Sequence, residues 1–334
     1  MLAVAMGMMT LVPSARADAA ADFYKGKTIN IYIGYSAGGG YDFYGRLVAR
    51  HLGRHVPGQP SVVPQNMPGA GSIRAANYVY SVAAKDGTAL GIVTQTIALE
   101  EALGTPGVQY KSAEFNWIGR TTSNVDVNLM WHTSKVKTFA DAYKYEVPVA
   151  GTGPGSASEV MPQLLDGLLG TKFKIIGGYP GATEGMVAME RGEVEGSHTS
   201  WNTVKLSKQD WLKEKKINII LQYALERHSD LPDVPTMVEV GRTPEEKQVL
   251  TLYASGAVVG RAFFTPPGVA KERVKALRDA FDAMLKDRKF LDEIAKTKAE
   301  FDPMSGAEMQ AVVEQAAAIP AAVRARARAA RGMQ

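Results

Sequence analysis

Strands and helices alternate along this chain, and a glycine-rich turn stands between most strands and the helix that follows. The first example is residues 29–52, where the run INIYIGY is followed by Gly38–Gly40 and then by a helical pattern from Tyr41 to Leu52. The same order recurs in residues 60–82, 145–170 and 172–201. Such alternation predicts an α/β fold with parallel-rich sheets and argues against an all-helical bundle or a β-sandwich.

Two apolar connectors join the sets of strand–helix units. They lie around Trp117–Trp131 and Ile217–Tyr223, and neither is a polar Gly/Ser linker. We therefore expect the chain to cross between two domains twice, as structured strands, which is a hinge architecture. The first domain is predicted to comprise residues 18–125 and 226–334, and the second residues 126–225.

The first 17 residues have the pattern of a secretory signal peptide. Leu2–Val12 is apolar but too short to span a bilayer, and Ala15-Arg16-Ala17 matches an A-x-A cleavage site. Cleavage after Ala17 leaves a mature chain long enough for two domains of ordinary size. No other segment approaches transmembrane length, so we expect a soluble protein in the periplasm.

The chain contains no cysteine. An exported protein of this size is then held by its hydrophobic core, which excludes a disulfide scaffold, a thiol enzyme and a cysteine-ligated zinc site. The formal net charge is +4, but Lys and Arg are dispersed, so nucleic acid is not predicted as a partner. Only the C-terminal end is densely basic, and we interpret it as a solvated helix end carrying Arg324, Arg326, Arg328 and Arg331.

Four turns after predicted strands are rich in Gly, Ser, Thr or Pro: Ser36–Asp42, Met67–Ser72, Gly151–Ser158 and Gly177–Thr183. In open α/β sheets, ligands bind outside the carboxyl ends of the strands, where helix N-termini present free N–H groups and the positive end of the dipole. Several such turns at one cleft would form an anion site built from backbone. For any one turn taken alone, a tight turn without a ligand remains the alternative.

The first of these turns does not match the nucleotide-binding loops. Tyr41-Asp42 follows Gly40 where a Walker A loop needs Lys-Ser/Thr, and the glycines lack the G-x-G-x-x-G spacing. Asp42 keeps two interpretations. It either compensates the helix dipole or contacts a ligand hydroxyl, amine or ordered water.

Catalytic and metal-binding patterns are mostly missing. The chain has no G-x-S-x-G elbow, and His51 and His55 share a helix face without the Glu of an H-E-x-x-H motif, so a surface or helix-end role is favoured for both. His198 is expected to be a hydrogen-bonded structural histidine near the cleft. Tyr179 and Trp201 either stack on a ligand or pack in the core. We predict no catalytic residue, no metal and no cofactor.

Five stretches resemble the substrate-binding receptors of tripartite tricarboxylate transporters, the TctC or Bug family. They are, in order, YSAGGGYDFYGRLVARHL, QNMPGAGSIRAANYVY, AAKDGTALGIV, SDLPDVPTMVEVG and FFTPPGVAKERVKALRDAF. These stretches extend from the first predicted strand to the C-terminal helices. The resemblance implies a two-domain periplasmic-binding-protein fold, type II-like, with mixed, mostly parallel sheets joined by two hinge strands.

The resemblance also implies a binding site and a function. In the family, backbone N–H groups and ordered waters of the first two turns hold a ligand carboxylate, and the opposite domain completes the pocket. Carried over by position, the implied ligand-binding residues are Ser36, Ala37, Gly38, Gly39, Gly40, Asp42, Pro68, Gly69, Ala70, Gly71, Thr94, Gln95, Thr96, Gly155, Ser156, Ser158, Tyr179, Gly181, Ala182, Thr183, Thr199 and Ser200. The implied protein is a monomeric periplasmic receptor that captures a small carboxylate and docks transiently on the membrane subunits of a transporter.

Two other functions remain open. A loaded receptor that docks on a two-component sensor kinase needs the same fold and the same residues. An exported α/β enzyme would need a cluster of His, Asp, Glu or metal ligands at the turns, which offer mostly Gly, Ser, Thr and Ala. The first loop of the family commonly reads P-x-G-G-x-x-D, and Ser36 and Gly40 depart from it here, so the resemblance does not transfer the identity of the acid.

Overall fold

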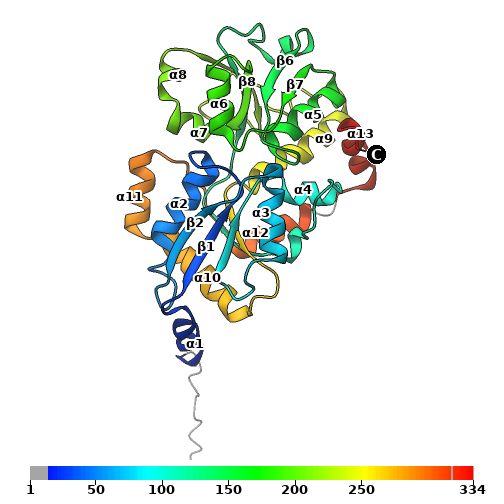
Figure 1. The fold of residues 1–334 in the computed structure, drawn as a ribbon. Coiled ribbons are helices and arrows are strands. Elements are labelled where there is room, and N and C mark those ends of the chain that lie inside the picture. Colours follow the sequence, from blue (N-terminus) through cyan, green and yellow to red (C-terminus); the bar gives the residue numbers. More distant parts are fainter. Residues whose placement is uncertain (1–13, 317–318, 334) are drawn as a thin grey trace, which may run out of the picture.

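The chain folds into two lobes, each built on one β-sheet with helices on its faces (Figure 1). The computed structural model describes residues 14–316 and 319–333. The predicted leader, residues 1–17, therefore lies largely outside the described residues, and the first described helix, α1 (Ser14–Tyr24), begins within it. Among the helices described, none combines the length and the apolar character needed to cross a membrane.

The first lobe contains a six-stranded sheet in the order β11-β4-β10-β3-β1-β2. Its strands are β1 (Thr28–Ile33), β2 (Ser61–Asn66), β3 (Ala89–Ile92), β4 (Asn116–Arg120), β10 (Ala262–Thr265) and β11 (Met304–Ser305). Its helices are α2 (Gly40–Leu52), α3 (Ile73–Ser81), α4 (Ile97–Ala102), α10 (Lys271–Leu285), α11 (Arg288–Thr297) and α12 (Gly306–Ala316), with short 3₁₀ helices η1 (Ala70–Ser72) and η2 (Ser112–Glu114).

Both faces of the first sheet are buried, as the sequence of β1 illustrates. Ile29, Ile31 and Ile33 point to one face and pack with residues of α2 and α10, whereas Tyr32 points to the other face and packs with residues of α3 and α12. This follows from the two-residue period of a strand. Full burial of each isoleucine contributes roughly 1.5–3 kcal/mol, so a strand with three isoleucines on one face and a buried tyrosine on the other favours a position inside the sheet.

The second lobe contains a five-stranded sheet in the order β7-β6-β8-β5-β9. Its strands are β5 (Asp126–Trp131), β6 (Val147–Ala150), β7 (Phe173–Ile176), β8 (Gly196–Ser200) and β9 (Ile217–Tyr223). The helices around it are α5 (Ala157–Leu169), α6 (Ala182–Glu190), α7 (Trp201–Ser207), α8 (Gln209–Lys213), α9 (Pro244–Ala254) and α13 (Ala321–Ala330), with 3₁₀ helices η3 (Phe139–Tyr143) and η4 (Ser255–Val258) near them.

Helix α5 begins directly after Ser156. The N-cap is Ser156, whose backbone is extended at φ −74° and ψ 149°, and Pro162 consequently lies in the second turn of the helix. The Ser158 hydroxyl instead accepts a hydrogen bond of 2.9 Å from the Thr152 N–H. This serine therefore fixes the turn in front of the helix.

The sheets are mixed, as predicted, but antiparallel pairs are as prominent as parallel ones. In the described strands, β1 pairs in parallel with β2 and β3, and β6 with β7 and β8. The antiparallel pairs involve β4, β5, β9, β10 and β11. Strands joined by a helix within one lobe run parallel, whereas strands next to a passage between lobes reverse direction.

The first passage between the lobes lies where it was expected, between β4 and β5. The second differs, because β9 pairs along its whole length with β5 inside the second sheet. The chain returns between η4 and β10, and the two passages run side by side: the Thr121 N–H donates to the Arg261 carbonyl at 3.1 Å and the Arg261 N–H to the Thr122 carbonyl at 2.9 Å. The residue boundaries of the two domains stay a prediction.

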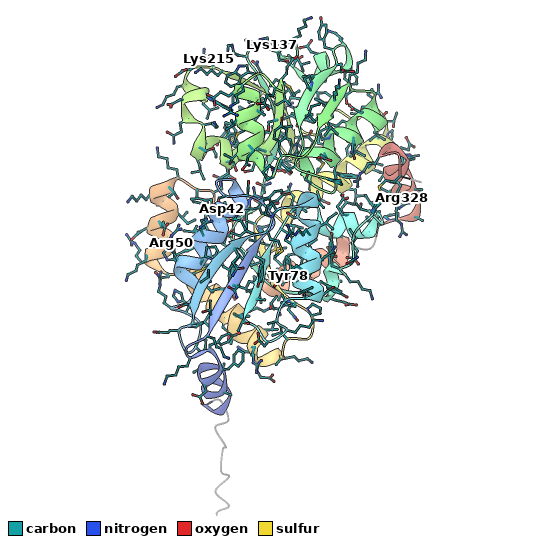
Figure 2. All side chains as sticks on the ribbon, viewed as in Figure 1. Asp42, Arg50, Tyr78, Lys137, Lys215 and Arg328 are labelled. Carbon is teal, nitrogen blue, oxygen red and sulfur yellow. The ribbon has the colours of Figure 1, made fainter. Side chains whose placement is uncertain are left out.

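The C-terminal segment contains two helices. Helix α12 packs on β4 of the first lobe, whereas α13 packs on α5 and α9 of the second, and Figure 2 shows Arg328 at the side of the molecule on this last helix. The expectation of a solvated end holds for Arg324 and Arg326, which are exposed. It is wrong for Arg331, whose side chain is 5% exposed and forms a 2.9 Å ion pair with the fully buried Glu100.

Candidate ligand-binding site

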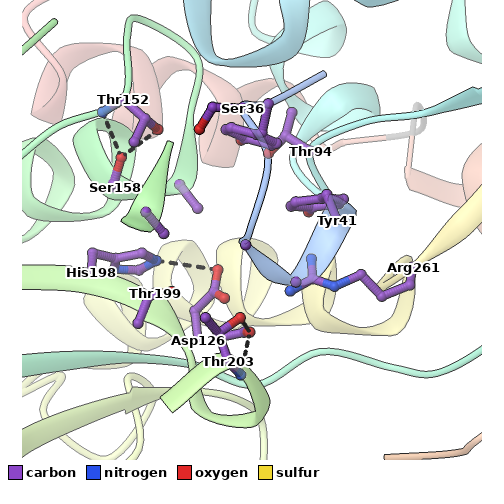
Figure 3. A pocket seen from close by; sticks show the side chains of 16 residues that line it. Ser36, Tyr41, Thr94, Asp126, Thr152, Ser158, His198, Thr199, Thr203 and Arg261 are labelled. Atoms are coloured by element: carbon purple, nitrogen blue, oxygen red, sulfur yellow. Dashed lines mark hydrogen bonds and ion pairs between the residues drawn. The ribbon is translucent and has the colours of Figure 1, made fainter. Parts of the chain in front are cut away.

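A cavity lies between the two lobes, and Figure 3 shows it at close range. The cavity is small: the space in which the centre of a water molecule fits has a volume of about 50 Å³. Its lining is Tyr35, Ser36, Gly39, Gly40, Tyr41, Thr94, Asp126, Thr152, Ala157, Ser158, Ala182, His198, Thr199, Ser200, Thr203 and Arg261. Most of these side chains carry hydroxyl, carboxylate, imidazole or guanidinium groups, so the cavity suits a small polar molecule.

Three helices of nine or more residues begin at the cavity, which explains its position in the fold. Their first residues are Gly40 of α2, Ala157 of α5 and Ala182 of α6, and each helix follows a strand of its own sheet. The first N–H groups of a helix have no acceptor within the helix, and the dipole adds a partial positive charge there. The cavity is therefore a favourable place for an anion.

The three consecutive glycines of the first turn differ in backbone conformation and in the space around them. Gly38 has φ +92°, a conformation that side chains rarely adopt. A Cβ on Gly40 would lie 2.8 Å from Thr203 Oγ1 and 2.9 Å from Arg261 Nη2. Gly39 has an ordinary extended backbone and no atom within 4 Å of its Cβ position. Only Gly39 leaves free space beside the backbone.

Asp42 supports this turn from behind and does not line the cavity. Its carboxylate accepts hydrogen bonds from the Gly38 N–H at 2.9 Å, from Asn66 Nδ2 at 2.9 Å and from Arg46 Nε at 2.8 Å. Burial alone would raise the pKa of Asp42, but these hydrogen bonds and the Arg46 charge outweigh it and hold the pKa below its usual value. Figure 2 places Asp42 at the end of α2 that faces the second lobe.

Asp126, at the start of β5, is the acidic group of the cavity. Its carboxylate accepts hydrogen bonds from Asn124 Nδ2 at 2.6 Å and Gln95 Nε2 at 3.1 Å, and His198 Nε2 lies at 3.2 Å. Burial acts to raise the pKa of Asp126, yet the hydrogen bond and charge of His198 and the charge of Arg261 lower it overall. Asp126 is therefore a buried carboxylate, that is, a hydrogen-bond acceptor.

A stack of one cation and two tyrosines forms another wall. The Arg261 guanidinium lies 3.8 Å from the centre of the Tyr41 ring, and that ring stacks on Tyr35 at 4.8 Å. The Tyr41 hydroxyl accepts a 2.8 Å hydrogen bond from the Gln95 N–H. Burial raises the pKa of both tyrosines, so both rings stay neutral, and the Tyr41 ring offers its face to the cation.

The second predicted turn meets the opposite lobe rather than the cavity. A Cβ on Gly71 would lie 2.2 Å from the Ser156 nitrogen, and one on Gly153 would lie 2.8 Å from the Gly71 nitrogen. Thr96 Oγ1 also donates a 2.9 Å hydrogen bond to the Gly155 carbonyl. These contacts join the lobes beside the cavity through bare backbone.

Polar contacts close the lobes on another side. The Ser36 hydroxyl donates to Glu184 at 2.8 Å, and the Ser36 N–H donates to the Pro180 carbonyl at 3.2 Å. Asn202 Nδ2 of α7 donates to the Tyr44 hydroxyl of α2 at 2.8 Å. Since these bonds cross the lobe boundary, the two lobes are closed on one another in this structure.

The structure brings eight of the predicted site residues to the cavity wall: Ser36, Gly39, Gly40, Thr94, Ser158, Ala182, Thr199 and Ser200. The others lie around it, in the turns and lobe contacts just described or one residue away from them. They are Ala37, Gly38, Asp42, Pro68, Gly69, Ala70, Gly71, Gln95, Thr96, Gly155, Ser156, Tyr179, Gly181 and Thr183. A ligand role for any of these residues stays a prediction.

Sequence reasoning missed the charged groups of the cavity. Asp126 and Arg261 were not singled out, although both line the cavity. Each is the lone charge in an otherwise uncharged, mostly apolar stretch, NVDVNLMW and VVGRAFF. That isolation was the available signal, because a charge inside a buried segment needs a partner or a function.

The remaining candidates have structural partners. Trp201 is 6% exposed and donates through Nε1 to Asp230 at 3.0 Å, and Tyr179 packs at the edge of the same apolar cluster. His51 lies 2.6 Å from Glu293 and His55 lies 3.0 Å from Asp287, so both hold α11 against α2. Within residues 14–316 and 319–333, no group of three or more His, Asp or Glu side chains is arranged to hold a metal ion.

Comparison with protein families gives one extensive match. The model for the tripartite tricarboxylate transporter family receptor, TctC, matches residues 45–324. A relative, the UPF0065 protein in the gbd 5′ region of Cupriavidus necator, is 25% identical over 300 residues, which cover 85% of this chain and 82% of that protein.

Solved structures share the two-lobe fold. The periplasmic binding protein BugD is similar with a TM-score of 0.71 and 21% identity, over 88% of this chain and 95% of that one. A Rhodopseudomonas palustris protein with adipate gives 0.69 and 21%, over 90% and 97%. MatC from the same organism with bound malate gives 0.68 and 22%, over 87% and 96%. At these identities the likeness is one of fold, that of the periplasmic binding proteins.

Proposed function

The chain belongs to the tripartite tricarboxylate transporter receptor family, and we propose that it captures a small organic acid in the periplasm and delivers it to the membrane subunits of such a transporter. The acid would bind between the lobes, in the cavity at which α2, α5 and α6 begin. The convergence of these three helix N-termini on one cavity between the lobes is the observation that carries the proposal. The binding event involves no chemical step.

The closed lobes support a capture mechanism. A ligand shifts an open–closed equilibrium only by the contacts that it gains in the closed state. Here the cavity wall combines Ser36, Gly39 and Thr94 of the first lobe with Ser158, Thr199 and Ser200 of the second. A ligand that touches both groups stabilises the closed form. The solved structures of the same fold with malate and adipate support a carboxylate as the ligand.

Isothermal titration calorimetry of the purified protein tests this function. The panel should contain mono-, di- and tricarboxylates, hydroxy acids, aromatic acids and amino acids. We expect at least one acid to bind, and small-angle X-ray scattering to show a smaller radius of gyration in its presence. Absence of binding across the whole panel would contradict the proposal. Uptake of the bound acid by cells that produce the cognate membrane subunits, compared with cells that lack them, tests delivery.

A further inference from the structure

Arg261 is a buried cation with unused hydrogen-bonding capacity. The residue is 3% exposed, and its backbone is held in the passage between the lobes by the hydrogen bonds to Thr121 and Thr122. Nη2 donates to Asn124 Oδ1 at 2.7 Å, whereas Nη1 is buried and has no hydrogen-bond partner. A buried guanidinium N–H without a hydrogen-bond acceptor is energetically costly. The closed lobes therefore leave a position beside Arg261 where a ligand can supply that acceptor.

The guanidinium lies beside the first turn of α2. Nη2 would be 2.9 Å from a Cβ on Gly40, and both residues line the cavity, as does Gly39. Helix α2 has 13 residues, so the N–H groups of its first turn and its dipole act on the same point as the cation. Arginine suits a carboxylate because its planar fork matches both carboxylate oxygens.

A carboxylate of the protein lies on the far side of Asn124. The Asn124 amide donates to Asp126 at 2.6 Å and accepts from Arg261 at 2.7 Å, so one side-chain amide separates the two charges. Asp126 also lines the cavity, and its neighbours His198 and Gln95 keep it ionised. A ligand group next to Asp126 must therefore donate a hydrogen bond, and a second ligand carboxylate there would be repelled.

We propose that Arg261, together with the N-terminus of α2, binds the ligand's carboxylate, and that Asp126 accepts a hydrogen bond from a hydroxyl or ammonium group on the neighbouring carbon. The ligand is then a small hydroxy or amino acid rather than an unsubstituted acid or a compact dicarboxylate. This assignment rests on the proposed receptor function and names the class of acid that the receptor takes. Arg261 and Asp126 are thereby specificity-determining residues of this site.

Matched acids of equal length test the assignment on the wild-type protein. The three-carbon set is propionate, lactate, alanine and malonate, and the four-carbon set is butyrate, 2-hydroxybutyrate, 2-aminobutyrate and succinate. By calorimetry we expect the hydroxy or the amino acid to bind at least about tenfold tighter than the unsubstituted acid and the dicarboxylate of the same length. The better of these two substituents identifies the donor.

Variants then test each residue. Arg261→Met should weaken binding of the best acid by about 100-fold or more, whereas the control Arg288→Met, 88% exposed on α11, should leave it unchanged. Asp126→Asn should weaken binding of the substituted acid about tenfold and improve binding of the dicarboxylate, since an amide can donate to it. Should Arg261→Met fail to fold, Arg261→Lys keeps the charge without the fork and should show a loss of about tenfold or more.

The outcomes separate this inference from the receptor function. Binding of other acids with a preference for dicarboxylates or unsubstituted acids, or an Arg261 variant of wild-type affinity, overturns the assignment and leaves the receptor intact. If no acid binds, either here or in the wider panel, the receptor function itself fails. Should Asp126→Asn fail to fold, the wild-type ranking of the matched acids decides on the role of Asp126.

Discussion

Gly71 of the first lobe lies directly against Ser156 of the second, and a Cβ on Gly71 would be 2.2 Å from the Ser156 nitrogen. Cβ atoms in proteins do not approach a backbone atom so closely, so no side chain fits at this point while the lobes are closed. Gly71 is also left-handed, with φ +60°. The lobe contact therefore depends on glycine for space as well as for conformation.

Gly71→Ala should weaken ligand binding about tenfold or more, because the methyl group prevents full closure. Gly26→Ala is the matched control: Gly26 has φ +73°, but no atom lies within 4 Å of its Cβ position. Both substitutions carry the conformational cost of a left-handed alanine, about 1–2 kcal/mol. Calorimetry and thermal unfolding of the two variants should show similar losses of stability but a loss of affinity in Gly71→Ala only. Equal affinities would show that this contact is not needed for binding.

Gly39→Val should lower affinity at little cost in stability. The backbone of Gly39 has φ −88° and ψ 177°, which any residue adopts, and its Cβ position is free of contacts. Gly39 is the N-cap of α2, where valine is less favourable than glycine, so we expect the free energy of unfolding to fall by about 1 kcal/mol or less, while the side chain takes space that a carboxylate needs at the N-terminus of α2. Thermal unfolding and calorimetry decide the matter. Unchanged affinity would place the valine side chain in the outer groove between Phe43 and Leu206, which Gly39 also lines.

Much of the first lobe could be predicted from the sequence because its signals are local. The strand at residues 28–33 and the helix at residues 40–52 each carry their own periodicity, and the glycine turn between them has its own chemistry. The strand at Ile217–Tyr223 was equally recognisable as an element. Its place inside the second sheet was not, because pairing with β5 depends on contacts far apart in the sequence.

The charged residues of the site could not be predicted from local sequence patterns, because they also depend on contacts between distant parts of the chain. Arg261 and Asp126 are 135 positions apart in sequence order, and their burial makes sense only once Asn124 joins them across the passages between the lobes. Arg331 is a similar case, since its partner Glu100 lies in α4, 231 residues earlier in the chain. In contrast, turns such as Ser36–Asp42 carry their signal in adjacent residues.

Asp166 makes stability depend on pH in an unusual direction. Burial raises the pKa of this carboxyl from its ordinary value to about 6, although Thr171 Oγ1 and the Phe173 N–H donate to it at 2.6 and 3.0 Å. The folded state therefore holds its proton more tightly than the unfolded state, and stability falls as pH rises from about 4 to 6. This effect lowers the free energy of unfolding at pH 7 by about 1–2 kcal/mol, allowing for water that reaches the half-buried group.

Asp166→Asn should raise the melting temperature at pH 7.5 and leave it nearly unchanged at pH 4. The amide oxygen can accept the same two hydrogen bonds, and the amide carries no charge. Asp210→Asn, at a carboxylate whose side chain is 83% exposed, is the control and should have little effect at either pH. Thermal unfolding across this range measures the difference. A melting temperature that drops at pH 7.5 would contradict the assignment.

The ion pair between Glu100 and Arg331 fastens the C-terminal helix α13 to α4, with the two side chains 0% and 5% exposed. Thr105 Oγ1 adds a 2.6 Å hydrogen bond to the same carboxylate. Ionised groups so deeply buried need each other, because removal of one leaves the other without compensation. Both members of the pair are therefore needed if α13 is to pack on α5 and α9 as observed.

Arg331→Met should lower the free energy of unfolding by about 3–5 kcal/mol, since it strands the Glu100 carboxylate in an apolar setting. The double variant Glu100→Gln/Arg331→Met should recover most of this loss, because no buried charge is left. The control Arg324→Met, at an exposed position on the same helix, should lower the free energy of unfolding by less than about 0.5 kcal/mol. Urea unfolding measures these three variants and the wild type. Adding the single variant Glu100→Gln completes the double-mutant cycle for the ion pair. If Arg331→Met and Arg324→Met cost the same, the C-terminal helix is held by its apolar face alone and the buried pair contributes nothing to its attachment.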